Sequence, residues 1–184
     1  MNTSKYIKNI AAALLGYPAY TCASVSEVKV EVRRLAPSEL SLVYRVHHEI
    51  DALLIPMTAQ SSRTDELWKH TCAEVFIAAP KQKAYYEFNF SPSTQWAAYG
   101  FTDYRAGMQS IDCAAPLIEV TTTERDLRLE VRLSLPMPLA NQALLEVGVT
   151  MVIEDTVGRC SYWAVSHEAP MPDFHCRDGF KLLV

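Results

Sequence analysis

Alternation of apolar and charged residues is the feature that most limits what this chain can fold into. In the segment VKVEVRRL, residues 28–35, valines at every second position alternate with lysine, glutamate and arginine. Successive side chains of a strand point to opposite faces, so a period of two predicts a strand with one buried and one exposed face. Such strands must pack their apolar faces together, which predicts an all-β protein.

The same period predicts strands along most of the chain. Residues 40–46 are the expected hairpin partner of the first strand, and residues 70–78, 84–90 and 95–101 form a meander through the turn sequences PKQK and SPST. Further strands are expected at 52–56, 117–124, 127–135, 144–155, 160–166 and 179–184. Because no β-α-β alternation is present, we expect an antiparallel two-sheet β-sandwich or jelly roll, Ig-like in outline.

Two short helices are expected beside the strands. The apolar run IAAALLGY, within an N-terminal segment spanning 1–20, predicts an amphipathic helix ended by Gly16 and Pro18. The lysines that precede this run also fit a weak signal peptide, which leaves export open beside the cytoplasmic localisation that we expect. The segment LANQALLE, residues 139–146, predicts a second helix.

Size and charge exclude several classes of protein. A length of 184 residues with 49% hydrophobic content suits one domain, spanning 1–184, with a real core. A formal net charge of -4 with scattered lysines and arginines disfavours nucleic-acid binding. No apolar run approaches the roughly 20 residues needed to span a bilayer, so we expect no membrane span. The five cysteines contain no C-x-x-C pair, which disfavours a disulfide framework and a thiolate zinc site.

Polar residues gather on one face of the predicted meander. Alternation along its first strand puts Trp68, His70 and Glu74 on the face away from the core. If the next strand pairs through the PKQK turn, Glu87 and Asn89 lie beside them. The residues expected to face the core instead are Thr71, Ala73, Val75, Ile77, Tyr86, Phe88 and Phe90.

Two later segments add candidates. Trp163 and His167 share a face of CSYWAVSH, and the loop HEAPMPDFHCRDGF carries His175. Aromatic planes stack on the apolar faces of a sugar ring, while carboxylates and amides hold its hydroxyls, so this combination favours a carbohydrate. The candidate ligand-binding residues are therefore Trp68, His70, Glu74, Glu87, Asn89, Trp163, His167 and His175.

Other interpretations of the same residues stay open. The tryptophans also fit core anchors, and His70, Glu74 and Asn89 also fit an internal polar network that fixes strand register. In an enzyme acting on a carbohydrate or small metabolite, His70 with Glu74 or Glu87 would serve as acid and base. A zinc site at His70, Cys72 and Glu74 would need a fourth ligand from elsewhere.

Three segments together resemble a known group of domains. TDELWKHTCAEVFI, YYEFNFSPSTQWAAYGFTDYR and MPDFHCRDGF resemble bacterial DOMON-like domains, specifically the murB-like subgroup, whose wider relatives include family 9 carbohydrate-binding modules. The resemblance covers nearly the whole chain and implies a β-sandwich that binds a small ligand, a sugar or haem. In the carbohydrate-binding relatives, positions corresponding to Trp68, Glu74 and Asn89 build the sugar site.

The haem-binding relatives hold iron between one methionine and one histidine. Here the resemblance offers the methionines Met57, Met108 and Met171 and the histidines His70, His167 and His175. No pair of them matches the family's ligand positions. We therefore expect a non-enzymatic domain with no resident cofactor, whose partner is a small molecule, most plausibly a sugar or sugar derivative.

Overall fold

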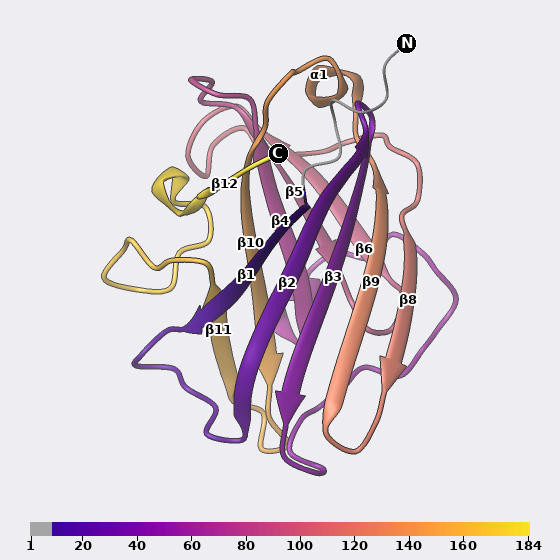
Figure 1. Cartoon of the computed structure of the whole chain (residues 1–184), viewed down its shortest axis with the longest axis vertical. Coiled ribbons are helices and arrows are strands. Elements are labelled where there is room, and N and C mark those ends of the chain that lie inside the picture. Colours follow the sequence, from indigo (N-terminus) through magenta and orange to yellow (C-terminus); the bar gives the residue numbers. More distant parts are fainter. Residues whose placement is uncertain (1–8) are drawn as a thin grey trace.

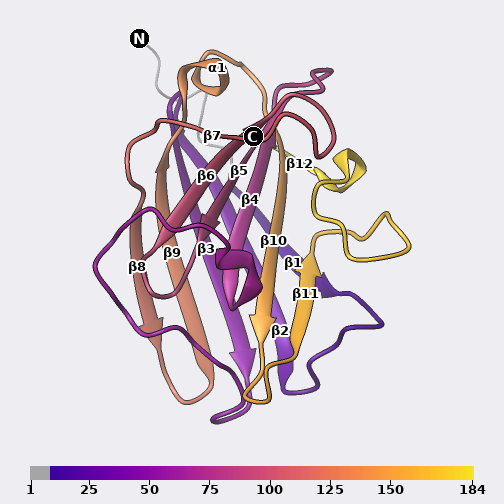
Figure 2. The same cartoon turned by 180° about the vertical axis from the view of Figure 1, so that it is seen from behind.

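The computed structural model describes residues 9–184, and its regular secondary structure consists almost entirely of antiparallel strands (Figures 1 and 2). The strands are β1 (Asn9–Gly16), β2 (Val25–Ala36), β3 (Glu39–His48), β4 (Cys72–Ala78), β5 (Tyr85–Phe90), β6 (Trp96–Phe101), β7 (Gln109–Ser110), β8 (Leu117–Thr122), β9 (Asp126–Ser134), β10 (Glu146–Glu154), β11 (Cys160–Ala164) and β12 (Leu182–Leu183). The other elements are the helix α1 (Met137–Ala140) and the 3₁₀ turns η2 (Leu67–Lys69) and η3 (Arg177–Gly179). The all-β prediction is confirmed.

The strands form one sheet that curls back on itself. Its order is β7-β6-β5-β4-β10-β11-β1-β2-β3-β9-β8, with β12 beside β10. Figure 1 shows β2, β3, β9 and β8 in front, which we call the front layer, and β4, β5, β6 and β10 behind, which with β11 we call the back layer. Two separate sheets were predicted; here both layers belong to one hydrogen-bonded sheet, because β1 pairs with β2 along 9–14 and with β11 at Leu15 and Gly16.

β1 stands where the sequence predicts an N-terminal helix. Of the predicted segment 1–20, residues 1–8 lie outside the described part, and Asn9–Gly16 is a strand. An apolar run of this length does not distinguish helix from strand by itself, and the free backbone groups of β2 and β11 decide the outcome. The helix prediction was therefore wrong, and Leu14 and its alternate neighbours Ile10 and Ala12 contribute to the core.

Other departures from the predicted elements are local. The strand expected at 52–56 is reduced to a single bridge between Leu53 and Asp155, and β7 was not predicted. The helix α1 overlaps the predicted helix at 139–146 but begins earlier and is shorter. Among residues 9–184, no helix is both long and apolar enough to cross a membrane.

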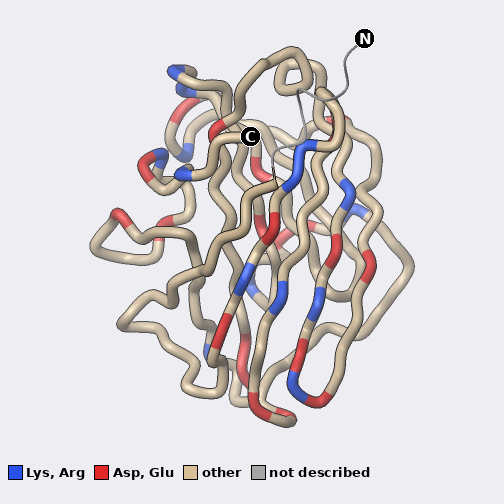
Figure 3. Tube along the Cα trace, in the orientation of Figure 1, with Lys and Arg blue, Asp and Glu red and all other residues tan. Residues whose placement is uncertain are grey.

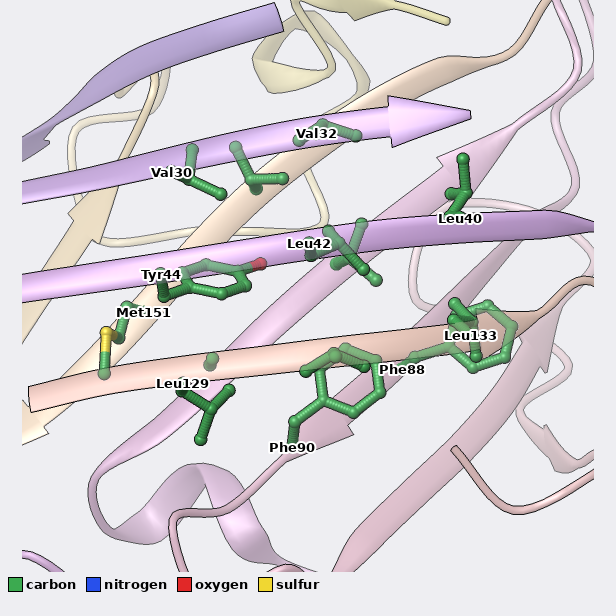
Figure 4. Close-up of a cluster of buried hydrophobic side chains, with 14 of the residues drawn as sticks. Val30, Val32, Leu40, Leu42, Tyr44, Phe88, Phe90, Leu129, Leu133 and Met151 are labelled. Atoms are coloured by element: carbon green, nitrogen blue, oxygen red, sulfur yellow. The ribbon is translucent and has the colours of Figure 1, made fainter. Parts of the chain in front are cut away.

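The main core lies between the two layers. Figure 4 shows side chains of β2, β3 and β9, among them Val30, Leu42 and Leu129, with Phe88 and Phe90 of β5. The opposite face of the front layer is polar, and Figure 3 shows acidic and basic residues following one another along its strands. This is the arrangement that the valine alternation predicts.

The outer face of the back layer carries a second, smaller apolar cluster. It includes Cys72, Phe76, Tyr85, Tyr99 and Phe101, from three neighbouring strands. Figure 2 looks at this face, where η2 lies over β4 and β5 and the C-terminal loop (165–181) lies to one side. The loop and η2 cover part of this face, so it is neither free surface nor the main core.

Candidate ligand-binding cavity

A cavity of about 560 Å³ lies on the outer face of the back layer. Its floor is made by strand residues: Glu74 of β4, Glu87 of β5, Tyr99 and Phe101 of β6, Val152 of β10, and Cys160 and Tyr162 of β11. Its rim is made by residues of η2 and of two loops: Trp68, Lys69, Arg105, Met108, Pro172, Phe174 and His175. Cavities of roughly 300–1,000 Å³ suit small organic ligands.

A row of three buried polar residues runs across the strands that carry the floor, and the middle one, Glu74, lines the cavity. Thr150 pairs with Glu74, and Glu74 pairs with Asn89, on the adjacent strands β10, β4 and β5. All three are buried, with Glu74 3% and Asn89 0% exposed. The atoms Thr150 Oγ1, Glu74 Oε1 and Asn89 Oδ1 have no hydrogen-bond partner among the described residues. A buried polar atom without a partner costs about 1–3 kcal/mol, so three in one row indicate a place for a ligand.

Glu87 completes the polar floor. It lies opposite Phe76 on β4, one diagonal step from Glu74, and is 5% exposed. Its Oε1 accepts a hydrogen bond of 2.8 Å from Asn89 Nδ2. This bond fixes the orientation of the Asn89 amide, because it leaves Oδ1 as the free atom of that group.

The two carboxyl groups titrate as a pair. Burial raises the pKa of Glu74 well above its ordinary value, and the charge of Glu87 raises it further. Burial raises the pKa of Glu87 to about 6, against the opposing effects of the Asn89 hydrogen bond and the Arg105 charge. Two like charges in a desolvated site disfavour each other, so the pair holds a proton into the neutral pH range.

His175 reaches the floor from the C-terminal loop. Its Nδ1 lies 2.7 Å from the Tyr85 hydroxyl, and its Nε2 lies 3.7 Å from Glu87 Oε2. Burial, with the nearby Arg105 charge, lowers the pKa of His175 to about 4, so the ring is neutral at pH 7. The Tyr85 hydroxyl accepts from the backbone N–H of Arg105 at 3.2 Å. We therefore assign its proton to the bond with Nδ1, which leaves the histidine proton on Nε2, facing Glu87.

Asp173 ties the two loops of the rim together. Its carboxylate accepts hydrogen bonds from the Tyr104 hydroxyl at 2.6 Å and from Arg105 at 2.8 Å. It also accepts the backbone N–H of His175 at 3.1 Å. The loop after β6 and the C-terminal loop are thus joined beside the cavity, and the positive charge of Arg105 is compensated there.

Aromatic rings form the walls. Trp68 packs edge-to-face on Tyr99, with ring centroids 6.1 Å apart, and Tyr162 does the same with Phe174 at 6.1 Å. The Tyr99 hydroxyl donates to Asp65 Oδ1 at 2.5 Å, which holds that ring in place. These rings surround the polar floor residues Glu74 and Glu87.

The structure brings together five of the eight sequence candidates. Trp68, Glu74, Glu87 and His175 line the cavity, and Asn89 lies buried between the two glutamates in the floor. Trp68 arrives from η2 at the rim and not from the face of a strand, because the chain turns at Glu66, whose φ is 62°.

Three candidates lie elsewhere. His70 precedes β4 and its Nδ1 contacts Glu154 Oε2 at 2.7 Å, outside the cavity. Trp163 points to the other face of β11, where it packs against the main core and donates to Ser161 Oγ at 3.0 Å. His167 Nε2 lies 2.8 Å from the carbonyl of Leu15. His70 and His167 lie beyond the ends of β4 and β11, where strand alternation no longer applies, whereas Trp163 lies within β11 on the face away from the cavity.

Sequence reasoning missed Thr150, Tyr162 and Phe174. A signal for Thr150 was present, because it is the one hydroxyl in the apolar strand EVGVTMVIE and shares a face with Gly148 and Val152. Tyr162 lies next to Trp163 and therefore on the opposite face of β11. A prediction that puts Trp163 in the site therefore leaves Tyr162 out of it. Phe174 belongs to a loop, whose course no periodic pattern predicts.

The residues do not fit a haem or a metal centre. Of the methionines and histidines considered for haem, Met108 and His175 line the cavity, but both ring nitrogens of His175 already face Tyr85 and Glu87. Met57 and Met171 are exposed outside it. Among residues 9–184, no group of three or more His, Cys, Asp or Glu could hold a metal ion.

Comparison with known proteins identifies the fold. No protein-family model and no curated protein matches the chain. A protein from Bacteroides uniformis, proposed to bind carbohydrate, matches with a TM-score of 0.62 and 13% identity over 94% of this chain and 84% of its own. A family 9 carbohydrate-binding module from Caldicellulosiruptor kristjanssonii, solved with cellotriose, matches with a TM-score of 0.56 and 11% identity over 89% of this chain and 75% of its own. The chain shares their fold. At these identities the likeness extends to the fold alone, and the site must be argued from its own residues.

Proposed function

We propose that this chain is a sugar-binding domain whose ligand occupies the cavity on the outer face of the back layer. The observation that carries the proposal is the row of unpartnered polar atoms on Thr150, Glu74 and Asn89. All three are buried; Glu74 lines a cavity large enough for a small ligand, and Thr150 and Asn89 flank it on the adjacent strands. A ligand with several hydroxyl groups would supply the missing partners.

The walls support the same ligand class. Trp68, Tyr99, Tyr162 and Phe174 present apolar rings around the polar floor. A sugar ring has hydroxyls at its edge and C–H groups on its faces, so it needs both kinds of surface at once. The carbohydrate-binding structures that share the fold add support at the level of architecture.

The DOMON-like relationship is part of the proposal. Its three motifs supply ten of the fourteen residues that line the cavity, among them Trp68, Glu87 and His175. The two-sheet sandwich that the relationship implies differs from the present sheet only in its continuity through β1. A sequence profile built from close homologues of this chain should match DOMON-like domains, and a profile that matches another family would reject the relationship.

Calorimetric titration with a panel of mono- and oligosaccharides tests the proposed function. We expect at least one sugar to bind, and we expect Thr150→Val to weaken it by roughly tenfold, because the variant loses one hydrogen bond and keeps the side-chain volume. The matched control is Thr121→Val, which removes a hydroxyl from an exposed position of β8. Failure of every sugar to bind, or equal binding by both variants, would reject the proposal.

Acid–base catalysis is a second candidate function. The observation that favours it is the pair Glu74 and Glu87, whose pKa values are both raised in one cavity, as in sites where one carboxyl acts as acid and its neighbour as base. His70 takes no part, because it lies outside the cavity. Incubating the purified protein with chromogenic glycosides between pH 4 and 8 tests this function, and binding without turnover at any pH would reject it.

A further inference from the structure

We infer that the sugar bound in this cavity carries a protonated amine, held at the floor by Glu74, Glu87 and Asn89. The inference rests on the proposed sugar-binding function and narrows it to one ligand class, the amino sugars with a free amino group. It stands on the kinds of atom that the floor offers and on the distribution of charge around it.

The floor offers hydrogen-bond acceptors. Glu74 Oε1 and Asn89 Oδ1 are unpartnered among the described residues, and the Asn89 amide nitrogen already donates to Glu87. Thr150 adds a hydroxyl, which accepts or donates. An ammonium group has three donors and no acceptor, whereas a sugar hydroxyl also brings lone pairs that need donors. The acceptor-rich floor therefore matches an ammonium better than a hydroxyl.

The cationic side chains near the floor already form ion pairs with other carboxylates. Arg105 pairs with Asp173 at 2.8 Å, and Lys69 pairs with Glu66 at 2.7 Å. Among residues 9–184, neither floor glutamate forms an ion pair with a lysine or arginine; the one ion-pair contact is the 3.7 Å approach of the neutral His175 to Glu87. Without a cation the carboxyl pair keeps a proton, and an ammonium would supply the positive charge that lets both groups ionise.

Every other titratable group facing the two glutamates is neutral or paired at pH 7. From the strands these groups are Tyr85, Tyr99 and Tyr162 with the thiols of Cys72 and Cys160, and burial raises the pKa of each. Tyr44 reaches Glu74 from the core side and donates to its backbone carbonyl at 2.7 Å, and burial raises its pKa as well. From the loops and η2 they are Arg105, Asp173, His175 and Lys69. The floor glutamates alone lack a counter-charge.

The aromatic walls suit a cation as well as a sugar ring. Trp68, Tyr99 and Tyr162 line the space above the glutamates. The face of an aromatic ring attracts a positive charge within about 6 Å of its centroid. The walls would therefore hold the ring of an amino sugar and add to the attraction for its ammonium group.

Binding of such a ligand must displace protons from the carboxyl pair. An ammonium favours the ionised form of Glu74 and Glu87, so complex formation near pH 6 releases protons to the buffer. A neutral sugar favours the protonated form and releases none. Calorimetry in two buffers of different ionisation enthalpy measures this release directly.

The test compares matched sugars that differ at one group. Glucosamine, galactosamine and mannosamine are titrated at pH 6 and 7 beside glucose, galactose, mannose and N-acetylglucosamine. We expect one of the three free amino sugars to bind roughly tenfold or more tightly than its neutral counterpart, with proton release at pH 6. N-acetylglucosamine keeps the nitrogen without its charge and should bind no better than glucose.

The variant Glu87→Gln separates charge from shape. The glutamine side chain has nearly the same volume, so we expect the ratio of amino-sugar to neutral-sugar affinity to fall by about tenfold. Glu119→Gln, an exposed position of β8, is the matched control and should keep the preference. A thermal unfolding curve of each variant checks that the fold is retained, and Glu74→Gln provides a second test if Glu87→Gln does not fold.

The outcomes distinguish this inference from the function on which it rests. A neutral sugar that binds as tightly as its amino counterpart, or amino-sugar binding without proton release at pH 6, overturns the inference and leaves the sugar-binding function standing. An N-acetylated sugar that binds as tightly as the free amine also overturns it. If no sugar of either kind binds, both the inference and the proposed function fail.

Discussion

The hydroxyl of Tyr85 lies 2.7 Å from Nδ1 of His175 and joins the floor of the cavity to its rim. Tyr85 lies on β5, two residues before Glu87. His175 comes from a loop 90 residues further along the chain. The same hydroxyl accepts the backbone N–H of Arg105. One buried oxygen therefore positions three segments that meet at the proposed site.

Removing this oxygen should loosen the rim. In Tyr85→Phe, the Nδ1 atom of His175 and the N–H of Arg105 both lose their partner, and we expect a loss of about 1–3 kcal/mol in the free energy of unfolding. Urea denaturation measures this change. Tyr86→Phe is the control, because the next tyrosine faces the main core and stands on the other side of the strand. An equal effect of both variants would show that the hydroxyl of Tyr85 has no special part.

Glu87 should make the protein less stable as the pH rises. Its pKa is raised from 4.5 to about 6 in the folded state, so the native protein binds more protons than the unfolded chain between these values. The free energy of unfolding therefore falls by about 2 kcal/mol, from this group alone, as the pH rises through 6. The difference between wild type and Glu87→Gln, measured by urea denaturation at pH 4.5 and 8, isolates this contribution. A difference that does not change with pH would contradict the prediction.

His175 should act in the opposite direction. Its pKa is lowered from 6.5 to about 4, so the unfolded chain binds more protons than the native protein between these values. The stability that this group contributes is present above pH 6.5 and is lost as the pH falls towards 4, by at most about 3 kcal/mol. We expect His175→Gln to show a smaller loss of stability between pH 7 and 4 than the wild type. An equal loss of stability in His175→Gln and in the wild type would contradict the prediction.

A methyl group at Gly148 should disturb the covering of the back layer. A Cβ atom built there would lie 2.9 Å from Cδ1 of Phe180, a buried ring near the end of the C-terminal loop. Because the ring must move off the sheet, we expect Gly148→Ala to cost about 1–3 kcal/mol of stability, measured by thermal or urea unfolding. Gly179→Ala is the control, since its nearest neighbour would be at 3.9 Å. A stable Gly148→Ala variant would show that Phe180 is free to shift.

The part of the floor that lies on β4 and β5 could be predicted because it depends on strand alternation alone. Glu74, Glu87 and Asn89 lie where the sequence placed them, since β4 and β5 pair in the expected phase through the PKQK turn. Trp163 does not lie where it was predicted, because alternation along β11 does not show which face of the strand meets the core. The rim depends on η2 and on the C-terminal loop, whose positions follow from long-range contacts such as that of Asp173 with Arg105. Local patterns in a sequence carry no information on such contacts.

The pairing of β1 also sets an order of events during synthesis. β1 pairs with β2 from Asn9 to Leu14. It pairs with β11 at Leu15 and Gly16, whose partners are Ala164 and Trp163. The neighbouring strand β2 is available early, but β11 is made only after nearly nine-tenths of the chain. Contacts of such long sequence separation form slowly, so the back layer and its cavity are completed late. Until then β1 offers an unpaired edge, and a growing chain is most exposed there to pairing with a neighbour.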